Sequence, residues 1–285
     1  MATANPAPPR SARPARTTSI VVFLLMLAAA LTVLAPVVWM LYSSVKTNLN
    51  ILQNVFSLPK SLYLGNYRTL FQSSPMPTWI GNSFLVTGLS VVGIALFSAL
   101  LAYAFATFSF RGKEKLFIFC LVGLMVPPQA LIISGFKWMS ILGLIGSRWA
   151  LIFTYLGWIS FGVLVLRNFF EAVPKDIIEA ARIDGAGHGR IFASIMLPLA
   201  RPSLGTVVVL NFMWVWNDFI YPLVYVDKAD QYTIPLGILQ YQSRLGVQWG
   251  TQMAALSVAA GVPLIVFVAF QRQFIRGVLQ GSVKG

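Results

Sequence analysis

Apolar residues in this chain are gathered into six long runs. The runs cover approximately Ile20–Tyr42, Trp79–Phe108, Leu116–Phe136, Trp149–Leu166, Ser203–Val226 and Gln252–Phe270. About 20 helical residues cross the hydrocarbon core of a bilayer, and within lipid every backbone amide has to be hydrogen-bonded internally. Each run is therefore predicted to be a membrane-spanning helix. The strict alternation of a transmembrane β-strand is absent from the runs.

Prolines and glycines interrupt the apolar pattern within the third run and between it and the fourth. The interrupting residues are Pro127, Pro128, Gly143 and Gly146. The bounds of these two predicted spans are therefore the least sharply defined of the six.

The composition agrees with an all-α membrane protein. Of the 285 residues, 57% are apolar and only 10% are charged, against about 25% charged in ordinary soluble domains. This argues against a soluble enzyme, a disordered scaffold and a collagen-like chain. The single cysteine, Cys120, offers no intramolecular disulfide or cysteine-based metal site, and we interpret it as a packing residue.

The net charge of +13 could suggest a nucleic-acid partner, but the positions of the basic residues favour orientation in a membrane instead. With six spans, the N-terminus, the turn near Arg111, the loop Arg167–Arg201 and the C-terminal tail hold 14 of the 21 basic residues. Both termini are therefore predicted to be cytoplasmic. Residues 1–18 are basic, rich in proline and free of acid, so we predict a disordered tail before a transmembrane domain over 19–285. A cleaved signal peptide or a transit peptide is the competing interpretation.

No catalytic or metal site can be recognised in the sequence. A P-loop and a serine nucleophile elbow are absent, and His188 is the only histidine, which we interpret as a surface residue of a polar loop. The chain is therefore predicted not to be an enzyme.

One carboxylate, Asp218, lies inside a predicted span, and an ionisable residue at such a position is a candidate functional residue. On one continuous helix Trp214, Asp218 and Tyr221 would share a face, and Pro222 would leave a kink. Together with Asn217 they are candidates for a translocation pathway, since aromatic faces beside hydrogen-bonding groups suit a polyhydroxylated solute. Alternatively Asn217 and Asp218 join neighbouring helices or lie near the outer interface, or Asp218 couples transport to protons.

The 35-residue loop Arg167–Arg201 is the most informative segment, because loops of this length tend to be functional. Asp176 can act as an N-cap, with Glu179 completing a capping box. A short helix Asp176–Asp184 is predicted to follow, and Gly185 suits its left-handed C-terminal cap.

A second short helix is predicted from His188 to Met196, ending before Pro198. Helices this short are not stable by themselves. They need a surface to pack against, and Ala180 and Ala181 allow a partner to approach closely.

This loop resembles the signature of the membrane subunits of bacterial ABC importers, in Glu179-Ala180-Ala181, Gly185 and Ile195-Met196-Leu197-Pro198. The resemblance implies the type I importer transmembrane fold, with six helices and cytoplasmic termini. It also implies that the first short helix is a coupling helix held in a cleft of a separate ATPase subunit. The docking residues implied are Asp176, Glu179, Ala180, Ala181, Asp184, Gly185, Ile195, Leu197 and Pro198.

Further motifs are similar to the carbohydrate branch of these permeases, of the maltose-permease second-subunit type. They are Asn66-Tyr67, Asn82-Ser83, Trp216-Asn217-Asp218-Phe219 and the ending Gly281-Ser282-Val283-Lys284-Gly285. The resemblance implies a bacterial plasma-membrane location, a second permease subunit, an ATPase dimer and an external solute-binding protein. The cargo would be a sugar, polyol or oligosaccharide. This chain would carry no cofactor, because ATP and magnesium would bind to the ATPase.

Three alternatives remain open at this stage. One is an ABC permease for a non-sugar solute, since the loop motif does not identify the cargo. The others are a self-sufficient secondary transporter or channel, and a membrane scaffold that only recruits a cytoplasmic partner. A secondary transporter would need internal repeats and paired intramembrane charges, and Asp218 stands alone.

Overall fold

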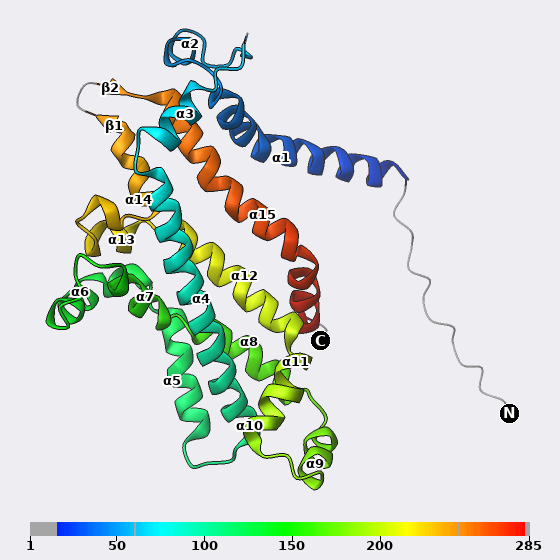
Figure 1. The fold of residues 1–285 in the computed structure, drawn as a ribbon. Coiled ribbons are helices and arrows are strands. Elements are labelled where there is room, and N and C mark those ends of the chain that lie inside the picture. The colour runs from blue at the N-terminus through cyan, green and yellow to red at the C-terminus, as the bar shows by residue number, and fades with distance from the viewer. Residues whose placement is uncertain (1–15, 60, 244–245, 283–285) are drawn as a thin grey trace.

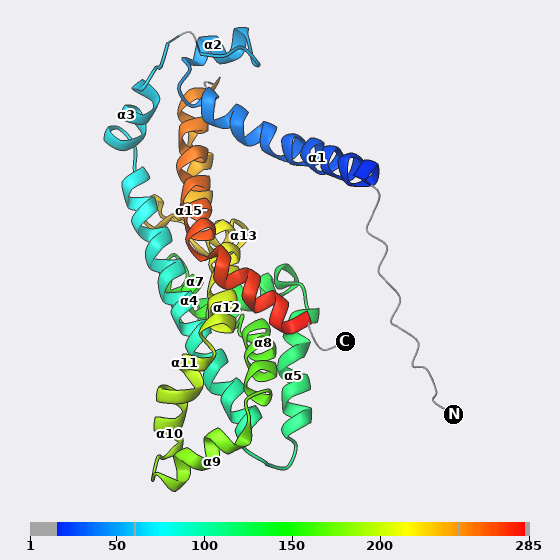
Figure 2. The ribbon, with the colours of Figure 1, turned by 90° about the vertical axis from the view of Figure 1, so that its right-hand side faces the viewer.

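The structure, a computed structural model, describes residues 16–59, 61–243 and 246–282, which are mostly helical (Figures 1 and 2). Most of the predicted N-terminal tail, residues 1–15, lies outside the described residues. Arg16–Thr18, predicted to belong to that tail, instead form the first turn of helix α1 (Arg16–Ser43). At the other end of the chain, residues 283–285 also lie outside the described part.

The first half of the chain passes from α1 through two short helices into a long one and then a broken one. The elements are α2 (Asn48–Gln53), α3 (Gly65–Gln72), α4 (Met76–Thr107), α5 (Lys113–Met125), the 3-10 turn η1 (Pro128–Leu131), α6 (Ile132–Ile141), α7 (Arg148–Leu156) and α8 (Ser160–Glu171). α4 lies centrally and packs against α7, α8 and α12 (Figure 1).

The second half contains the polar loop and the last long helices. Its elements are α9 (Lys175–Ile183), α10 (His188–Ile191), the π turn η2 (Phe192–Met196), α11 (Leu197–Leu199), α12 (Arg201–Asn217), α13 (Ile220–Tyr225), the 3-10 turn η3 (Ala229–Gln231), α14 (Ile234–Gly237), the 3-10 turn η4 (Ile238–Tyr241), β1 (Gln242–Ser243), β2 (Gly246–Val247) and α15 (Trp249–Ser282). The two short strands pair antiparallel, with Gln242 opposite Val247 and Ser243 opposite Gly246.

Four described helices are long and apolar enough to cross a membrane. They span Ile20–Ser43, Met76–Thr107, Arg148–Glu171 and Trp249–Gln271. Two bent pairs, Lys113–Met125 with Pro128–Ile141 and His188–Leu199 with Arg201–Asn217, bring the count to six if each pair is one span. The prediction of a helical membrane protein is therefore confirmed, with four to six candidate spans among the described residues.

Three of the predicted spans are not continuous helices. The run Trp149–Leu166 is divided by a turn at residues 157–159, between α7 and α8. The run Leu116–Phe136 breaks after Met125, and its two parts meet at 97°. Val126 and Pro127 are extended there, since Pro127 and Pro128 each lack an amide hydrogen and disfavour helical geometry in the residue before them. The run Ser203–Val226 is interrupted at Asp218.

Three buried clusters hold the helices together. One contains Ile94, Tyr155 and Tyr225, and a second contains Leu166, Ile191 and other residues near the polar loop. The third lies near α3 and α14. Helix α1 contacts α15 but extends away from it and from the other helices over most of its length in both views (Figures 1 and 2), and its apolar side chains are exposed.

Two asparagines of the carbohydrate-type motifs connect loops to helices. Asn66 donates to the carbonyls of Ser44 and Lys46 at 2.8 and 2.7 Å. Asn82 donates to the carbonyls of Asp230 and Tyr232, both at 2.8 Å. Both side chains are buried, so these motif positions have a structural role in the described fold.

Candidate functional site

The polar loop forms one end of the molecule, opposite the end that carries α2 and the β1–β2 hairpin (Figure 1). It leaves α8, turns through α9 and returns through α10 to α12. The predicted short helices are present here, although the structure differs from the prediction in how each begins and ends.

Helix α9 begins one residue earlier than predicted and without a capping box. Pro174 is the N-cap residue, and no side chain accepts a hydrogen bond there. Asp176 lies inside the first turn, so the prediction that it caps the helix is wrong. The reason is that Pro174 already adopts the extended conformation of an N-cap, at φ −55° and ψ 132°. Asp176 still lies where a negative charge favours the positive end of the helix dipole.

Gly185 ends α9 as predicted. Its φ is +78°, in the left-handed region, and a Cβ atom added there would meet nothing within 4 Å. The amide of Ala186 then donates to the carbonyl of Ala181 at 2.9 Å. The glycine is therefore required by backbone conformation rather than by crowding.

The two faces of α9 have different surroundings. Ala181 is 8% exposed and packs into the cluster of its own chain with Ile178. The opposite face is exposed and mixes charge with apolar surface: its residues include Asp176, Ile177, Glu179, Ala180, Ile183 and Asp184. Ala181 was predicted to allow close approach of a partner, but it instead allows α9 to approach the body. Ala180 remains available to a partner.

The return segment is one bent helix rather than a helix that stops at Pro198. α10, η2 and α11 follow one another without a break, and the chain turns by 77° into α12. At the end of the π turn, the amide of Leu197 donates to the carbonyl of Phe192. Pro198, which has no amide hydrogen, is accommodated directly after this wider turn. Ile195 and Leu197 are half-buried against the cluster, so they support the loop from within.

His188 connects α9 to α4, and it is half-buried rather than a surface residue. Its Nε2 lies 3.2 Å from Nη2 of Arg182, and its Nδ1 lies 3.2 Å from the Tyr103 hydroxyl. An arginine can only donate, so Nε2 accepts and the hydrogen is on Nδ1. The Phe108 ring lies against the imidazole, with ring centroids 4.7 Å apart. These contacts fix the orientation of the loop.

Arg167 forms a second connection at the base of the loop. Its side chain is 9% exposed and donates from Nη2 to Glu114 of α5 and from Nε to Glu171 of α8, each at 2.7 Å. These are the ion pairs present among the described residues. Charge-assisted bonds of this length are stronger than neutral ones. They join the start of α5 to the last turn before the loop.

The second candidate region is the break between α12 and α13. The helix ends at Asn217, and Asp218 is extended, with ψ 130°. The Tyr155 hydroxyl donates to Oδ2 of Asp218 at 2.6 Å, and Oδ1 accepts the amide of Ile220 at 3.2 Å. Asp218 therefore supports the start of α13. The predicted shared helix face of Trp214, Asp218 and Tyr221 is wrong, because the backbone is not helical at Asp218.

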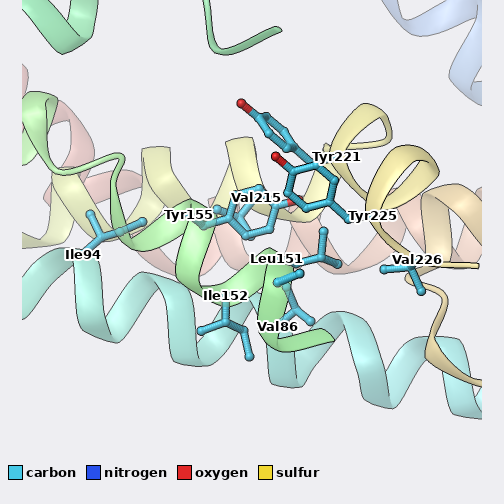
Figure 3. Packing of buried hydrophobic residues seen from close by; sticks show 10 residues of the cluster. Val86, Ile94, Leu151, Ile152, Tyr155, Val215, Tyr221, Tyr225 and Val226 are labelled. Atoms are coloured by element: carbon cyan, nitrogen blue, oxygen red, sulfur yellow. The ribbon is translucent and has the colours of Figure 1, made fainter. Parts of the chain in front are cut away.

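Tyr155, Tyr221 and Tyr225 lie together beside this break (Figure 3), and two of them also contact the segment that follows α5. The Tyr221 hydroxyl donates to the carbonyl of Pro128 at 2.6 Å, and that of Tyr225 to the carbonyl of Ile132 at 3.4 Å. Both carbonyls belong to the interrupted α5–α6 segment. Side chains of α13 therefore donate hydrogen bonds to the backbone of the interrupted α5–α6 segment.

The four predicted pathway residues fall into two pairs. Asp218 and Tyr221 lie in the tyrosine cluster, where Tyr221 is 3% exposed. Trp214 is 45% exposed with its ring against Phe161, and Asn217 is exposed and bonds to the carbonyl of Met213 in its own helix. Pro222 lies within α13, after the break rather than at it.

Sequence reasoning missed several residues of both regions: Tyr103, Glu114, Tyr155, Arg167, His188 and Tyr225. Their partners lie far along the chain, for example 53 residues between Glu114 and Arg167. The available signal for the ion pair was that both residues stand at ends of predicted spans.

The chain matches the protein family described as the inner membrane component of binding-protein-dependent transport systems, over residues 92–280. This range contains both candidate regions.

Individual relatives are similar over most of their length. The probable ABC transporter permease protein YurM of Bacillus subtilis is 34% identical, over 94% of this chain and 89% of the relative. The diacetylchitobiose uptake system permease protein NgcG of Streptomyces coelicolor is 32% identical, over 91% of this chain and 87% of the relative. A chain from the crystal structure of a bacterial ABC transporter involved in import of the polysaccharide alginate superposes with a TM-score of 0.83 at 23% identity, covering 94% of this chain and 100% of that chain.

Proposed function

Because the chain belongs to the family of inner membrane components of binding-protein-dependent transport systems, we propose that it is a membrane-spanning subunit of an ATP-driven importer for a sugar or a related oligosaccharide or polyol. It is a transport component and not an enzyme. A separate subunit, which binds ATP and magnesium, hydrolyses the ATP.

The sugar assignment is supported by the relatives and by the second candidate region. One relative is named for uptake of diacetylchitobiose, and the fold is that of a chain from an alginate importer. In this chain the exposed indole of Trp214 and the exposed amide of Asn217 lie one turn apart at the end of α12. An aromatic face beside a hydrogen-bonding group is suited to a solute with many hydroxyls.

The observation that carries the energy-coupling part is the exposed face of α9. It presents Glu179 and Asp184 beside Ala180, Ile177 and Ile183, of which Ile183 is 86% exposed. Charge around a small apolar patch is typical of a protein interface. We assign this face to the ATPase subunit, and we assign the end of the molecule that carries α9 to the cytoplasm. A second permease subunit and an external solute-binding protein complete the complex.

In the mechanism that follows, the ATPase moves α9 when it closes on ATP. α9 is anchored to its own chain through Ala181 and through the contact of Arg182 with His188, so its displacement reaches α4 and α8. The broken helices near Asp218 and Pro128 supply segments that can rearrange without unfolding a continuous span. Their rearrangement exposes the pathway to one side of the membrane and then to the other.

Reconstitution tests the proposal. The complex is purified through a tag on this chain, identified by mass spectrometry and placed in liposomes with its binding protein and a panel of labelled mono- and oligosaccharides. We expect uptake of at least one sugar that requires ATP, the ATPase and the binding protein together. Uptake by this chain alone, or ATP-dependent uptake of a non-sugar solute only, would contradict the proposal.

A further inference from the structure

Arg167 contacts α5 in two ways. Besides the bond to Glu114, the guanidinium carbon lies 3.8 Å from the centroid of the Phe117 ring. Glu114 and Phe117 are three residues apart on α5, so they present one face to Arg167. A planar cation can stack on an aromatic ring and bond a carboxylate at the same time. Arg167 of α8 therefore holds the N-terminal part of α5 through two contacts.

The turn η1, which follows the other end of α5, is also held. α5 ends at Met125, and the carbonyl of Pro128 directly beyond it accepts the hydroxyl of Tyr221 from α13. The helix thus lies between the last turn of α8 and the tyrosine cluster beside Asp218. Displacement of its first turn would act on its other end, since a helix of this length moves as a rigid element.

A movement of α9 would be transmitted first to the last turn of α8. α8 ends at Glu171, and α9 begins at Lys175 after a short connection through Pro174. Arg167 stands one turn before that connection. It is therefore the described side chain that joins the base of the loop to α5 by an ion pair.

We propose that Arg167 is a positioning residue that ties the base of the coupling loop to α5, so that movement of α9 also moves α5 and the break beyond it. This rests on the proposed function of α9. Without the tie, α9 still docks, but α5 no longer follows it.

The two carboxylates on Arg167 provide a matched comparison. Both lie 2.7 Å from the guanidinium, yet Glu114 joins α5 to α8, whereas Glu171 stays within α8. Glu114 is 63% exposed and Glu171 is 40% exposed, so neither pair contributes much to stability. A role in local stability predicts similar effects of removing either one. A role in transmission predicts an effect of removing Glu114 only.

The experiment measures the movement of α5 against α4 in the purified complex with its ATPase. Spin labels are attached to cysteines at Val92 of α4 and Ile118 of α5, which are 67% and 60% exposed, in a Cys120→Ser background. The distance between the labels is measured with and without ATP and magnesium. It is compared in the parent, in Glu114→Ala and in Glu171→Ala, alongside the rate of ATP hydrolysis. Glu114→Gln, which keeps an oxygen acceptor at the same reach, is the conservative variant.

We expect ATP to change the distance in the parent and in Glu171→Ala, and the change to be lost in Glu114→Ala while ATP hydrolysis continues. Glu114→Gln should retain part of the ATP-dependent change in the distance between the labels. An undiminished change in Glu114→Ala, or an equal loss in both alanine variants, would overturn the role of Arg167 and leave the proposed function intact. A parent distance that does not change with ATP would overturn the proposed role of Arg167, while ATP-dependent uptake in the reconstituted complex tests the proposed function separately.

Discussion

At the scale of single residues, docking of the ATPase depends on the exposed face of α9. Glu179 lies beside Ala180 on that face, and neither side chain is covered by its own chain. Glu179 is therefore free to meet a basic group on the ATPase. Ala181, its second neighbour, faces the opposite way and is committed to the body of the protein. The sequence predicted that both alanines lie at the interface. It could not separate them, because only tertiary packing decides which face of so short a helix is turned outward.

We predict that Glu179→Ala weakens binding of the ATPase without affecting membrane insertion. Truncating one partner of an interfacial charge pair costs about 2–5 kcal/mol, which at its lower limit is about a 30-fold loss of affinity. Co-purification of the ATPase and its titration into solubilised complex measure the effect. Asp230→Ala, in the 3-10 turn η3 away from α9, is the control and should bind normally, since Asp230 is also exposed. Equal affinity of the two variants would refute the assignment of Glu179.

We predict that Gly185→Val impairs docking through backbone strain alone. The left-handed conformation at φ +78° costs a residue with a Cβ about 1–2 kcal/mol, and a Cβ added there meets no atom within 4 Å. Gly185→Asn should be tolerated better, because asparagine visits this region more readily. ATP-dependent transport of the two variants is the measurement, and greater loss in the asparagine variant would contradict this explanation.

At the scale of elements, helix continuity is what the sequence described least well. The apolar runs located every candidate span, because burial in lipid depends on composition and length. The double proline at 127–128 indicated an interruption, and the structure confirms one there. The break at Asp218 was placed at Pro222 instead, since its position depends on a hydrogen bond from Tyr155, 63 residues away. The π turn before Pro198 likewise depends on packing that no local pattern records.

We predict that Tyr155→Phe destabilises the protein more than Tyr225→Phe. Both tyrosines are buried in the same cluster, but Tyr155 donates to a carboxylate at 2.6 Å and Tyr225 to a neutral carbonyl at 3.4 Å. Leaving a buried acceptor without its donor costs about 1–3 kcal/mol, and more for a charged one. Thermal unfolding in detergent ranks the variants. A larger loss from Tyr225→Phe would show that Asp218 is satisfied in another way.

At the scale of the whole molecule, family membership confirms the resemblance found in the loop motif. The motif residues needed no tertiary information, because Glu179, Gly185 and Pro198 lie close together in the sequence. The connections that would carry movement through the molecule, at Arg167, His188 and Tyr221, join residues 53 to 93 positions apart. A single sequence placed Glu114 and Arg167 at the ends of predicted spans, but no local pattern pairs residues at such separations.

Site-specific crosslinking tests the central claim, that α9 is held by the ATPase on the inner side of the membrane. A photoreactive group is attached to a cysteine at Ile183 of α9, or at Leu62 near the opposite end as the control, in a Cys120→Ser background. Both positions are strongly exposed, at 86% and 74%. We predict that position 183 crosslinks to the ATPase and is labelled by membrane-impermeant reagents only in inside-out vesicles. Position 62 should not crosslink to the ATPase and should not be labelled in inside-out vesicles. Labelling of position 183 in intact cells, or ATPase crosslinks from position 62 alone, would contradict the account.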